Sequence, residues 1–298
     1  MTVSNNCYSC PFYTVVGILL ALFFLPTVAD ADPPPSKTIV AVGDLHADLS
    51  SAKKAFSIAG ITDATGTWIL KDAIVVQTGD LTDRGPDGQP LLEWVRDLET
   101  QAPEHNSQFI VLLGNHEVMN VQGDWRYVSM ADIQSFGGLE KRKQAFTTGG
   151  EWSEWLKTKD AVLQIGDTIF VHGGVSRQFA KPAETLSNEV RQAMSGVGDR
   201  SVLGENGPLW YRGYWLQTEA TACDEARFVL DQLDAKRMVM GHTTQRDGKI
   251  HSRCEGILFA IDTGISRHYG EHPSALRLTG NTVEALYESG AIILSAPE

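Results

Sequence analysis

The sequence predicts an α/β fold. Five short apolar runs have the composition of buried strands, at residues 38–42, 73–76, 109–113, 168–171 and 237–240. Helical patterns separate several of them, at residues 49–59, 89–98, 183–194 and 224–233. Strands that alternate with helices in this way are typical of an α/β domain.

The composition excludes several classes of protein. The chain has 298 residues, of which 42% are hydrophobic and 21% charged, so it can bury a large core and is not a disordered protein. With 37 Asp and Glu against 25 Lys and Arg, its formal net charge is −12. Proteins that coat nucleic acid or anionic membranes need clustered positive charge, so we expect no nucleic-acid partner. A phosphate substrate is possible only where positive charge is concentrated.

The first 31 residues have the pattern of a signal peptide. Residues 13–25 are apolar, and Ala29-Asp30-Ala31 has the small-x-small form of a signal-peptidase site. The apolar run is too short to span a bilayer comfortably. We therefore expect an exported protein, periplasmic or secreted, with no stable membrane span after cleavage. Because no Lys or Arg precedes the run, an uncleaved anchor and a buried N-terminal helix are the alternatives.

A proline-rich linker follows at residues 32–36, and we expect a single folded domain over residues 37–298. Two cysteines lie in this domain, Cys223 and Cys254. An even number of cysteines in an oxidising compartment is compatible with a disulfide. Two unpaired buried thiols are the alternative, and the sequence does not decide between them.

Three later runs are short and apolar, at residues 256–261, 275–278 and 283–287. A Thr-Gly-Asn-Thr turn at residues 279–282 lies between the last two. We interpret these runs as antiparallel strands, which suggests that a second sheet is added.

Polar residues follow each of the first five apolar runs. The segments are GDLH at 43–46, GDLTDRG at 79–85, GNHE at 114–117, HGG at 172–174 and GHT at 241–243. In open α/β sheets ligands bind at the carboxyl ends of the strands, so five such ends predict one convergent site. The glycines allow the chain to leave a strand sharply.

These segments contain the side chains that a metal centre needs. The candidate ligands are Asp44, His46, Asp80, Asn115, His172 and His242. Asp44 and His46 are two residues apart on a segment that leaves a strand, so they can chelate one ion. A carboxylate can bridge two ions, and the set is sufficient for a pair of ions if one Asp is shared. Mn, Fe and Zn all accept these oxygen and nitrogen ligands.

The ordered set of motifs resembles the metal-dependent phosphoesterases of the calcineurin-like superfamily. GDxxDRG together with GNHE is specific to its phosphoprotein phosphatase branch. The segments NVQGDWRY at 120–127 and PLWYRG at 208–213 look most like the bacterial-type Shewanella-like phosphatases. The similarity runs from about residue 38 to residue 278, and it departs from the family pattern at Ala47, where Gly is usual.

The resemblance implies a two-sheet β-sandwich flanked by helices, the αββα metallophosphoesterase fold. It also implies two divalent or mixed-valence ions (Mn, Fe or Zn). Asp44, His46 and Asp80 would hold one ion, while Asp80, Asn115, His172 and His242 would hold the other. A water shared by such ions would have its pKa lowered towards about 7, and the resulting hydroxide could attack phosphorus in line.

Four further residues are expected to act on the substrate. Arg84 and Arg212 would clamp the phosphate oxygens, because a guanidinium matches phosphate geometry. Surface ion pairs are their alternative role. His116 would donate a proton to the leaving group and Asp83 would orient it; otherwise His116 packs the turn. We expect Glu117 to support the loop by hydrogen bonding.

Other residues near these motifs leave their role open. Several aromatic residues could form a wall for a phosphoaryl group or pack in the core: Trp152, Trp155, Trp210, Tyr211 and Tyr214. Arg126 is a weaker third candidate for a phosphate clamp. Residues 121–160 have the character of an insertion that shapes access to the site.

The expected function is therefore an exported phosphatase of phosphorylated proteins or peptides, with phosphotyrosine preferred over phosphoserine and phosphothreonine by resemblance. A hydrolase of small phosphate esters or dinucleoside polyphosphates is the alternative. A phosphopeptide-binding module without catalysis is a third, which the intact Asp83 and His116 disfavour. The sequence leaves the oligomeric state and the identity of the metals open.

Overall fold

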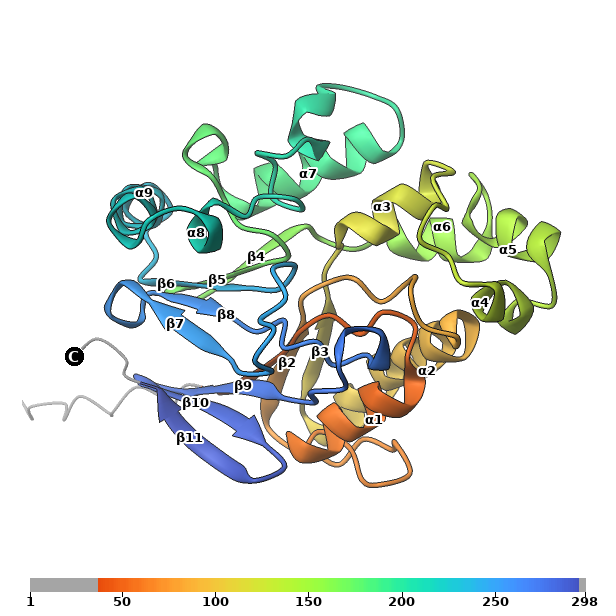
Figure 1. Ribbon diagram of the computed structural model, residues 1–298, viewed down its shortest axis with the longest axis horizontal. Helices are drawn as coiled ribbons and strands as arrows, with labels where there is room; N and C mark the ends of the chain where they lie inside the picture. The colour runs from red at the N-terminus through yellow and green to blue at the C-terminus, as the bar shows by residue number, and fades with distance from the viewer. Residues whose placement is uncertain (1–36, 295–298) are drawn as a thin grey trace, which may run out of the picture. The chain divides into compact units, whose positions relative to one another are not determined.

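Two mixed β-sheets form the centre of the computed structural model, which describes residues 37–294 (Figure 1). The first sheet has the strand order β11-β10-β9-β1-β2-β3. Its strands are β1 (Thr38–Val42), β2 (Ala73–Gln77), β3 (Gln108–Val111), β9 (Ala275–Thr279), β10 (Thr282–Tyr287) and β11 (Gly290–Leu294). Strands β1, β2 and β3 are parallel, whereas β9, β10 and β11 are each antiparallel to their neighbours.

The second sheet has the order β4-β5-β6-β8-β7. Its strands are β4 (Val162–Ile165), β5 (Thr168–Val171), β6 (Arg237–Met240), β7 (His251–Arg253) and β8 (Leu258–Ala260). The three central strands β5, β6 and β8 are parallel, and the two edge strands are antiparallel. Each sheet therefore contains three adjacent parallel strands, at one end of the first sheet and in the middle of the second, whose carboxyl ends can carry a site.

Helices cover the outer faces of the two sheets. Their bounds are α1 (Leu49–Ile58), α2 (Gly88–Gln101), α3 (Asn115–Val121), α4 (Met130–Ser135), α5 (Leu139–Phe146), α6 (Glu151–Leu156), α7 (Ala183–Met194), α8 (Gly213–Leu216) and α9 (Glu219–Gln232). In Figure 1, α1 and α2 lie beside the first sheet, while α7, α8 and α9 lie on the opposite side, next to the second. This arrangement is the predicted sandwich with helices on both sides.

The central strands are buried on both faces. In β1, Ala41 faces the second sheet and belongs to the same apolar cluster as Phe170 of β5. Its neighbour Val40 belongs to a larger cluster with Phe56 of α1. Successive residues of a strand point to opposite faces, so a strand between a sheet and a helix layer must be apolar at nearly every position. This is why these strands appear in the sequence as continuous apolar runs.

The four predicted helices are present, as α1, α2, α7 and α9, and the two last predicted runs form the antiparallel hairpin β9–β10. The three late runs do not form one added sheet, because β8 belongs to the second sheet whereas β9 and β10 belong to the first. β9 pairs with β1 and extends the first sheet, and β8 is parallel to β6. An apolar pattern reports how deeply a strand is buried, but it does not report which strand is its neighbour.

Cys223 of α9 and Cys254 form a disulfide, so the first of the two alternatives holds. The predicted signal peptide and linker, residues 1–36, lie outside the described residues. Within residues 37–294, none of the helices combines the length and the apolar composition needed to cross a bilayer.

Candidate metal and active site

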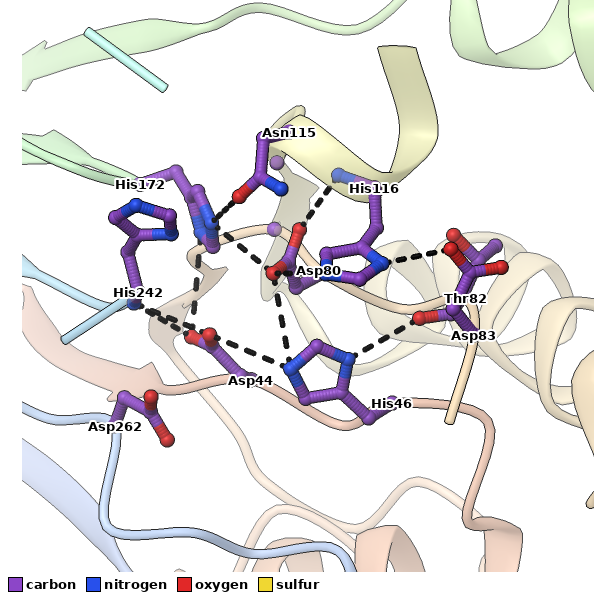
Figure 2. A network of polar contacts seen from close by, with 12 residues as sticks. Asp44, His46, Asp80, Thr82, Asp83, Asn115, His116, His172, His242 and Asp262 are labelled. Atoms are coloured by element: carbon purple, nitrogen blue, oxygen red, sulfur yellow. Dashed lines mark hydrogen bonds and ion pairs between the residues drawn. The ribbon is translucent and has the colours of Figure 1, made fainter. Parts of the chain in front are cut away.

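The six predicted metal ligands lie close together in one cluster (Figure 2). They follow the carboxyl ends of β1, β2 and β3 in the first sheet and of β5 and β6 in the second. None of the six side chains belongs to a residue that is more than 4% exposed. Asp and His are rarely buried to this extent unless they are paired or bind a metal, so these segments are not unrelated polar turns at the surface.

The donor atoms form two clusters that share Asp80. Those of His46, Asp80 and His116 lie within 4.8 Å of one another, and so do those of Asp80, His172 and His242. In the second cluster Asn115 Oδ1 lies 3.0 Å from His172 Nε2. The first cluster has His116 as its third member, where the resemblance implied Asp44. Asp44 is nevertheless adjacent, because its Oδ2 lies 3.8 Å from His46 Nε2.

Hydrogen bonds to the backbone turn two imidazoles toward the clusters. His46 Nδ1 lies 3.2 Å from the Thr82 carbonyl oxygen, and His172 Nδ1 lies 2.9 Å from that of Thr78. A carbonyl accepts only from an N–H, so in each ring Nδ1 carries the proton and Nε2 is free as a donor to a metal. Burial, above all, lowers the pKa of His46 to about 3, which keeps this imidazole neutral.

The His242 imidazole also suits a metal ligand. Burial lowers its pKa well below the usual value, and the neighbouring His172 and Arg212 act in the same direction. Among residues 37–294, its Nε2 has no hydrogen-bond partner although the atom is buried. A neutral imidazole with a free nitrogen in a polar cavity is chemically suited to bind a cation.

Three carboxylates are buried close together. Burial, followed by the charges of Asp262 and Asp80, raises the pKa of Asp44 well above its ordinary value. Asp262 Oδ2 is buried and has no hydrogen-bond partner within the described part of the chain. Burial would also raise the pKa of Asp80, but the His172 and His116 imidazoles outweigh it and hold that pKa well below the ordinary value. A cation would stabilise the ionised form of carboxylates in this setting, so the residues present fit metal ions.

His116 and Asp83 form the predicted pair. His116 Nδ1 lies 2.7 Å from Asp83 Oδ2, and both side chains are buried. Burial lowers the pKa of His116, but the charge of Asp80 and the hydrogen bond and charge of Asp83 outweigh this and raise it above its ordinary value. His116 Nε2 lies 3.8 Å from Asp80 Oδ2, so the ring reaches from Asp83 to the shared carboxylate.

The two predicted arginines flank the clusters from opposite ends. Arg212 Nη1 donates to the His242 carbonyl oxygen at 2.6 Å. The Arg84 guanidinium stacks on Tyr127, 3.9 Å from the ring centre, and that ring packs against the ring of His116. Neither arginine forms an ion pair with a carboxylate among the described residues, so the surface ion pair is not their role.

The site backbone is strained. Six residues of the site that are not glycine have left-handed φ angles between 46° and 70°: His46, Ala47, Asp80, Asp83, Arg84 and His242. Such residues cost free energy and persist only where the surrounding structure fixes them, which is typical of active sites. Ala47, where the family usually has Gly, adopts φ 50° and is fully buried, a conformation that glycine would adopt with less strain.

Glu117 holds the turn after β2 in place. Its carboxylate accepts hydrogen bonds from the backbone N–H groups of Asp80, Leu81, Thr82 and Gly114, and from the Thr82 hydroxyl, at 2.8–3.1 Å. The expectation that Glu117 supports the loop is therefore confirmed.

The aromatic residues separate into two groups. Trp152 and Tyr214 pack in the core, whereas Trp210 lies beside the site with its ring centre 5.5 Å from that of His242. Trp210 also lines a cleft of about 360 Å³ that includes Asn115 and Tyr127. Arg126 is exposed at the rim of this cleft and pairs with Asp124, so it is not a third phosphate clamp in this arrangement.

Two neighbours of the clusters are not among the site residues predicted from the sequence. Asp262 comes directly after the apolar run at 256–261, so it follows the carboxyl end of a strand as the predicted ligands do. Tyr269 packs on the His46 ring at a centroid distance of 4.9 Å, and burial raises its pKa to about 12. Tyr269 belongs to a polar segment, and its sequence neighbours gave no signal for this contact.

Comparisons with known proteins agree with this geometry. The model of the calcineurin-like phosphoesterase family matches residues 37–246. An uncharacterized protein of Schizosaccharomyces pombe is 36% identical over 266 residues, which cover 84% of this chain and 80% of that protein. Shewanella-like protein phosphatase 2 of Arabidopsis thaliana is 30% identical over 281 residues, covering 77% of this chain and 71% of that protein.

A solved structure is similar as well. The cold-active protein-tyrosine phosphatase of a psychrophilic Shewanella species superposes with a TM-score of 0.76 at 25% identity, covering 87% of this chain and 80% of that one. Together with the two His/Asp clusters, the family fold indicates a binuclear metal site. The chain belongs to the calcineurin-like phosphoesterase family and is a metal-dependent phosphoric-ester hydrolase.

Proposed function

We propose that this protein is an exported phosphoprotein phosphatase that prefers phosphotyrosine. The observation that carries the proposal is the convergence of buried Asp, His and Asn side chains from five strand ends on the His116–Asp83 pair. The relatives named protein phosphatases and the solved protein-tyrosine phosphatase support a protein substrate and the tyrosine preference.

Six side chains would hold two ions, Mn, Fe or Zn, with Asp80 shared: Asp44, His46, Asp80, Asn115, His172 and His242. Asp262 is buried beside them. When bound, such ions supply a water molecule of lowered pKa and neutralise the charge of the phosphate. In this acidic protein, the two ions would concentrate positive charge at the site where the phosphate binds.

The chain's own residues would bind the ester and complete the reaction. Arg212, anchored on the His242 carbonyl, and Arg84, stacked on Tyr127, would bind the phosphate oxygens and fix the orientation of the ester. His116 would donate a proton to the leaving oxygen, and Asp83 keeps the ring oriented for that transfer.

The cleft beside the site fits an aryl leaving group. Val118, Met119, Tyr127 and Trp210 line it and offer apolar and aromatic surface. A phenol ring buries more apolar area against such a wall than a serine side chain does, which supports the tyrosine preference. Trp210→Ala should therefore raise KM for a phosphotyrosine peptide more than for a phosphoserine peptide.

Phosphate release by the purified protein tests the function. Phosphotyrosine, phosphoserine and phosphothreonine peptides and diadenosine tetraphosphate are compared, each with Mn, Fe or Zn after treatment with a chelator. We expect release from phosphopeptides, fastest for phosphotyrosine. Faster hydrolysis of the dinucleotide would instead favour the alternative function, and no release with any metal would contradict catalysis.

Export is part of the proposal. The apolar run at residues 13–25 with its small-x-small site and the disulfide between Cys223 and Cys254 support an oxidising compartment. Mass spectrometry of the protein from fractionated cells should find a mature chain that begins at Asp32. A chain that keeps residues 1–31 in the membrane fraction would favour the uncleaved anchor.

A further inference from the structure

We infer that Arg142, in α5, is a positioning residue that fixes Asp83 so that Asp83 orients His116 for proton transfer. The inference rests on the proposed function, in which His116 acts on the leaving group. Arg142 is the longest polar side chain in the buried network behind this pair. It lies in the 121–160 segment, for which the sequence suggested only a role in access.

The two oxygens of Asp83 have different partners. Oδ2 contacts His116 Nδ1 at 2.7 Å. Oδ1 accepts from Asn120 Nδ2 at 2.9 Å and from Arg142 Nη2 at 3.2 Å. Because two donors hold Oδ1, the carboxylate cannot rotate without breaking them, and Oδ2 stays directed at the imidazole.

Arg142 also orients Asn120. Its Nη1 donates to Asn120 Oδ1 at 2.8 Å, which turns the Nδ2 end of that amide toward Asp83 and the His116 carbonyl oxygen. An arginine can donate only, so the amide oxygen must face it. Arg142 therefore supplies one donor to Asp83 directly and sets the direction of the other.

The far side of Arg142 is fixed by α4. Its Nε donates to Asp132 Oδ2 at 2.7 Å, and Asp132 is itself fully buried. Asp132 sits so close to the first residue of α2 that a Cβ at Gly88 would collide with Oδ1. The guanidinium is thus held between α4 and Asp83. The ring centres of Phe136 and Phe146 lie 5.4 and 4.9 Å from its Cζ atom and cover it.

Packing alone does not explain a charged residue here. Arg142 is 2% exposed, and an apolar side chain of the same length would fill this space without the cost of desolvating a cation. Its planar fork, by contrast, reaches Asp132, Asn120 and Asp83 at once, which a lysine cannot do. The fork also supports a turn in which Asp83 and Arg84 both adopt φ 70°.

The dependence of turnover on the leaving group tests the inference. If Arg142 acts through His116, then Arg142→Met should slow phenyl phosphate, a poor leaving group, on the order of tenfold or more. p-Nitrophenyl phosphate, whose leaving group needs little protonation, should slow by less than about threefold. A merely structural residue would slow both substrates alike, and an equal loss would overturn the inference.

Two further variants serve as comparisons. Arg237→Met removes another buried arginine, 4% exposed and in β6, and should leave the ratio of the two rates unchanged. In an Asp83→Asn background, Arg142→Met should add no further dependence on the leaving group. Additive effects in that double variant would contradict action through Asp83. Arg142→Lys repeats the test with the charge retained, should the Met variant not fold.

A second measurement does not depend on activity. The Nδ1 proton of His116, hydrogen bonded to a carboxylate, should give a downfield resonance in the NMR spectrum of the histidine-labelled protein. We expect it to be lost or displaced in the Arg142 variants and kept in Arg237→Met. An unchanged resonance would overturn the inference even if the wild-type chain released no phosphate, in which case the proposed function alone would have failed on the activity assay.

Discussion

The Asp83 carboxylate stabilises the protonated form of His116. Although burial lowers the pKa of His116, the charge of Asp80 and the hydrogen bond that His116 donates to Asp83 raise it above the ordinary value. A general acid must be protonated, so the turnover number should fall as the pH rises through this raised pKa. Asp83→Asn removes the charge and should move that fall to lower pH. We also expect a loss in kcat at pH 8 on the order of 10².

The pH profile of kcat on a phosphotyrosine peptide measures this shift. Asp247→Asn is a matched control, because Asp247 pairs with the His251 imidazole at 3.0 Å on the surface, away from the metal clusters. Its profile should follow the wild type. A basic limb that stays in place in Asp83→Asn would show that another group donates the proton.

Residues of the site differ in how far the sequence could predict them. Asp44, His46 and Asp80 follow apolar runs and belong to spaced motifs, so their convergence could be inferred from strand ends alone. Asp262 has the same placement, but the run before it was interpreted as antiparallel. Arg142 stands between Lys141 and Lys143 in a polar helix. Nothing in that pattern distinguishes the buried cation from its more accessible neighbours, because burial there depends on α4 and α2.

At the scale of the element, Asp48 ties α1 to the loop before β9. It accepts from Ser51 N at the start of α1 and, at 2.8–3.0 Å, from the backbone N–H and side chain of Arg267. Burial would raise its pKa, but the hydrogen bonds from Arg267 and Ser51 outweigh this and lower it. We expect Asp48→Asn to reduce the free energy of unfolding at pH 7 by about 1–2 kcal/mol.

The sign of the pH dependence follows from the lowered pKa. The stabilising contribution of Asp48 is fully present above the unfolded pKa, about 3.9, and is lost as the pH falls through the lower folded pKa. Urea unfolding between pH 3 and pH 7 should therefore show the wild type and Asp48→Asn converging at the acid end. Asp199→Asn neutralises the exposed carboxylate that accepts from the Ser201 N–H, and it should change stability little at any pH. A constant difference for Asp48→Asn would contradict the ionic origin.

The disulfide joins α9 to the 3₁₀ turn at Cys254–Gly256 that follows β7. The two cysteines are 31 residues apart, for which the loop-closure model gives about 3 to 4 kcal/mol of stabilisation. Replacing both by Ser should lower the midpoint of urea unfolding accordingly. A reductant should destabilise the wild type but not the double variant. Equal sensitivity of the two proteins would show that the cross-link is not what stabilises this end of the second sheet.

For the whole molecule, the existence of two sheets was implied by family resemblance, but the division of strands between them was not. The five runs with polar ends are split between the sheets, three in one and two in the other, and their carboxyl ends still meet. The apolar runs are mostly buried in both sheets, so composition cannot assign a strand to either one. Only the pairing of β9 with β1 and of β8 with β6 decides it.

Because both sheets contribute donor atoms, metal binding should stabilise the fold as a unit. Asp80 of the first sheet is shared with His172 and His242 of the second, and the buried charges of Asp44, Asp80 and Asp262 repel one another without a cation. An ion whose free concentration is 100 times its dissociation constant adds about 2.7 kcal/mol to the free energy of unfolding. For a chain of this size, this raises Tm by roughly 5–10 °C.

Differential scanning calorimetry with chelator and then with Mn²⁺ measures this shift, and elemental analysis counts the ions. Asp80→Asn removes the ligand common to both clusters, so it should abolish most of the shift and lose both ions. His242→Ala removes a ligand from one cluster only and should keep one ion and part of the shift. His251→Ala, an exposed imidazole outside the clusters, should behave as the wild type. If Asp80→Asn still bound two ions with the full rise in Tm, the carboxylate would not bridge the two sheets through metal.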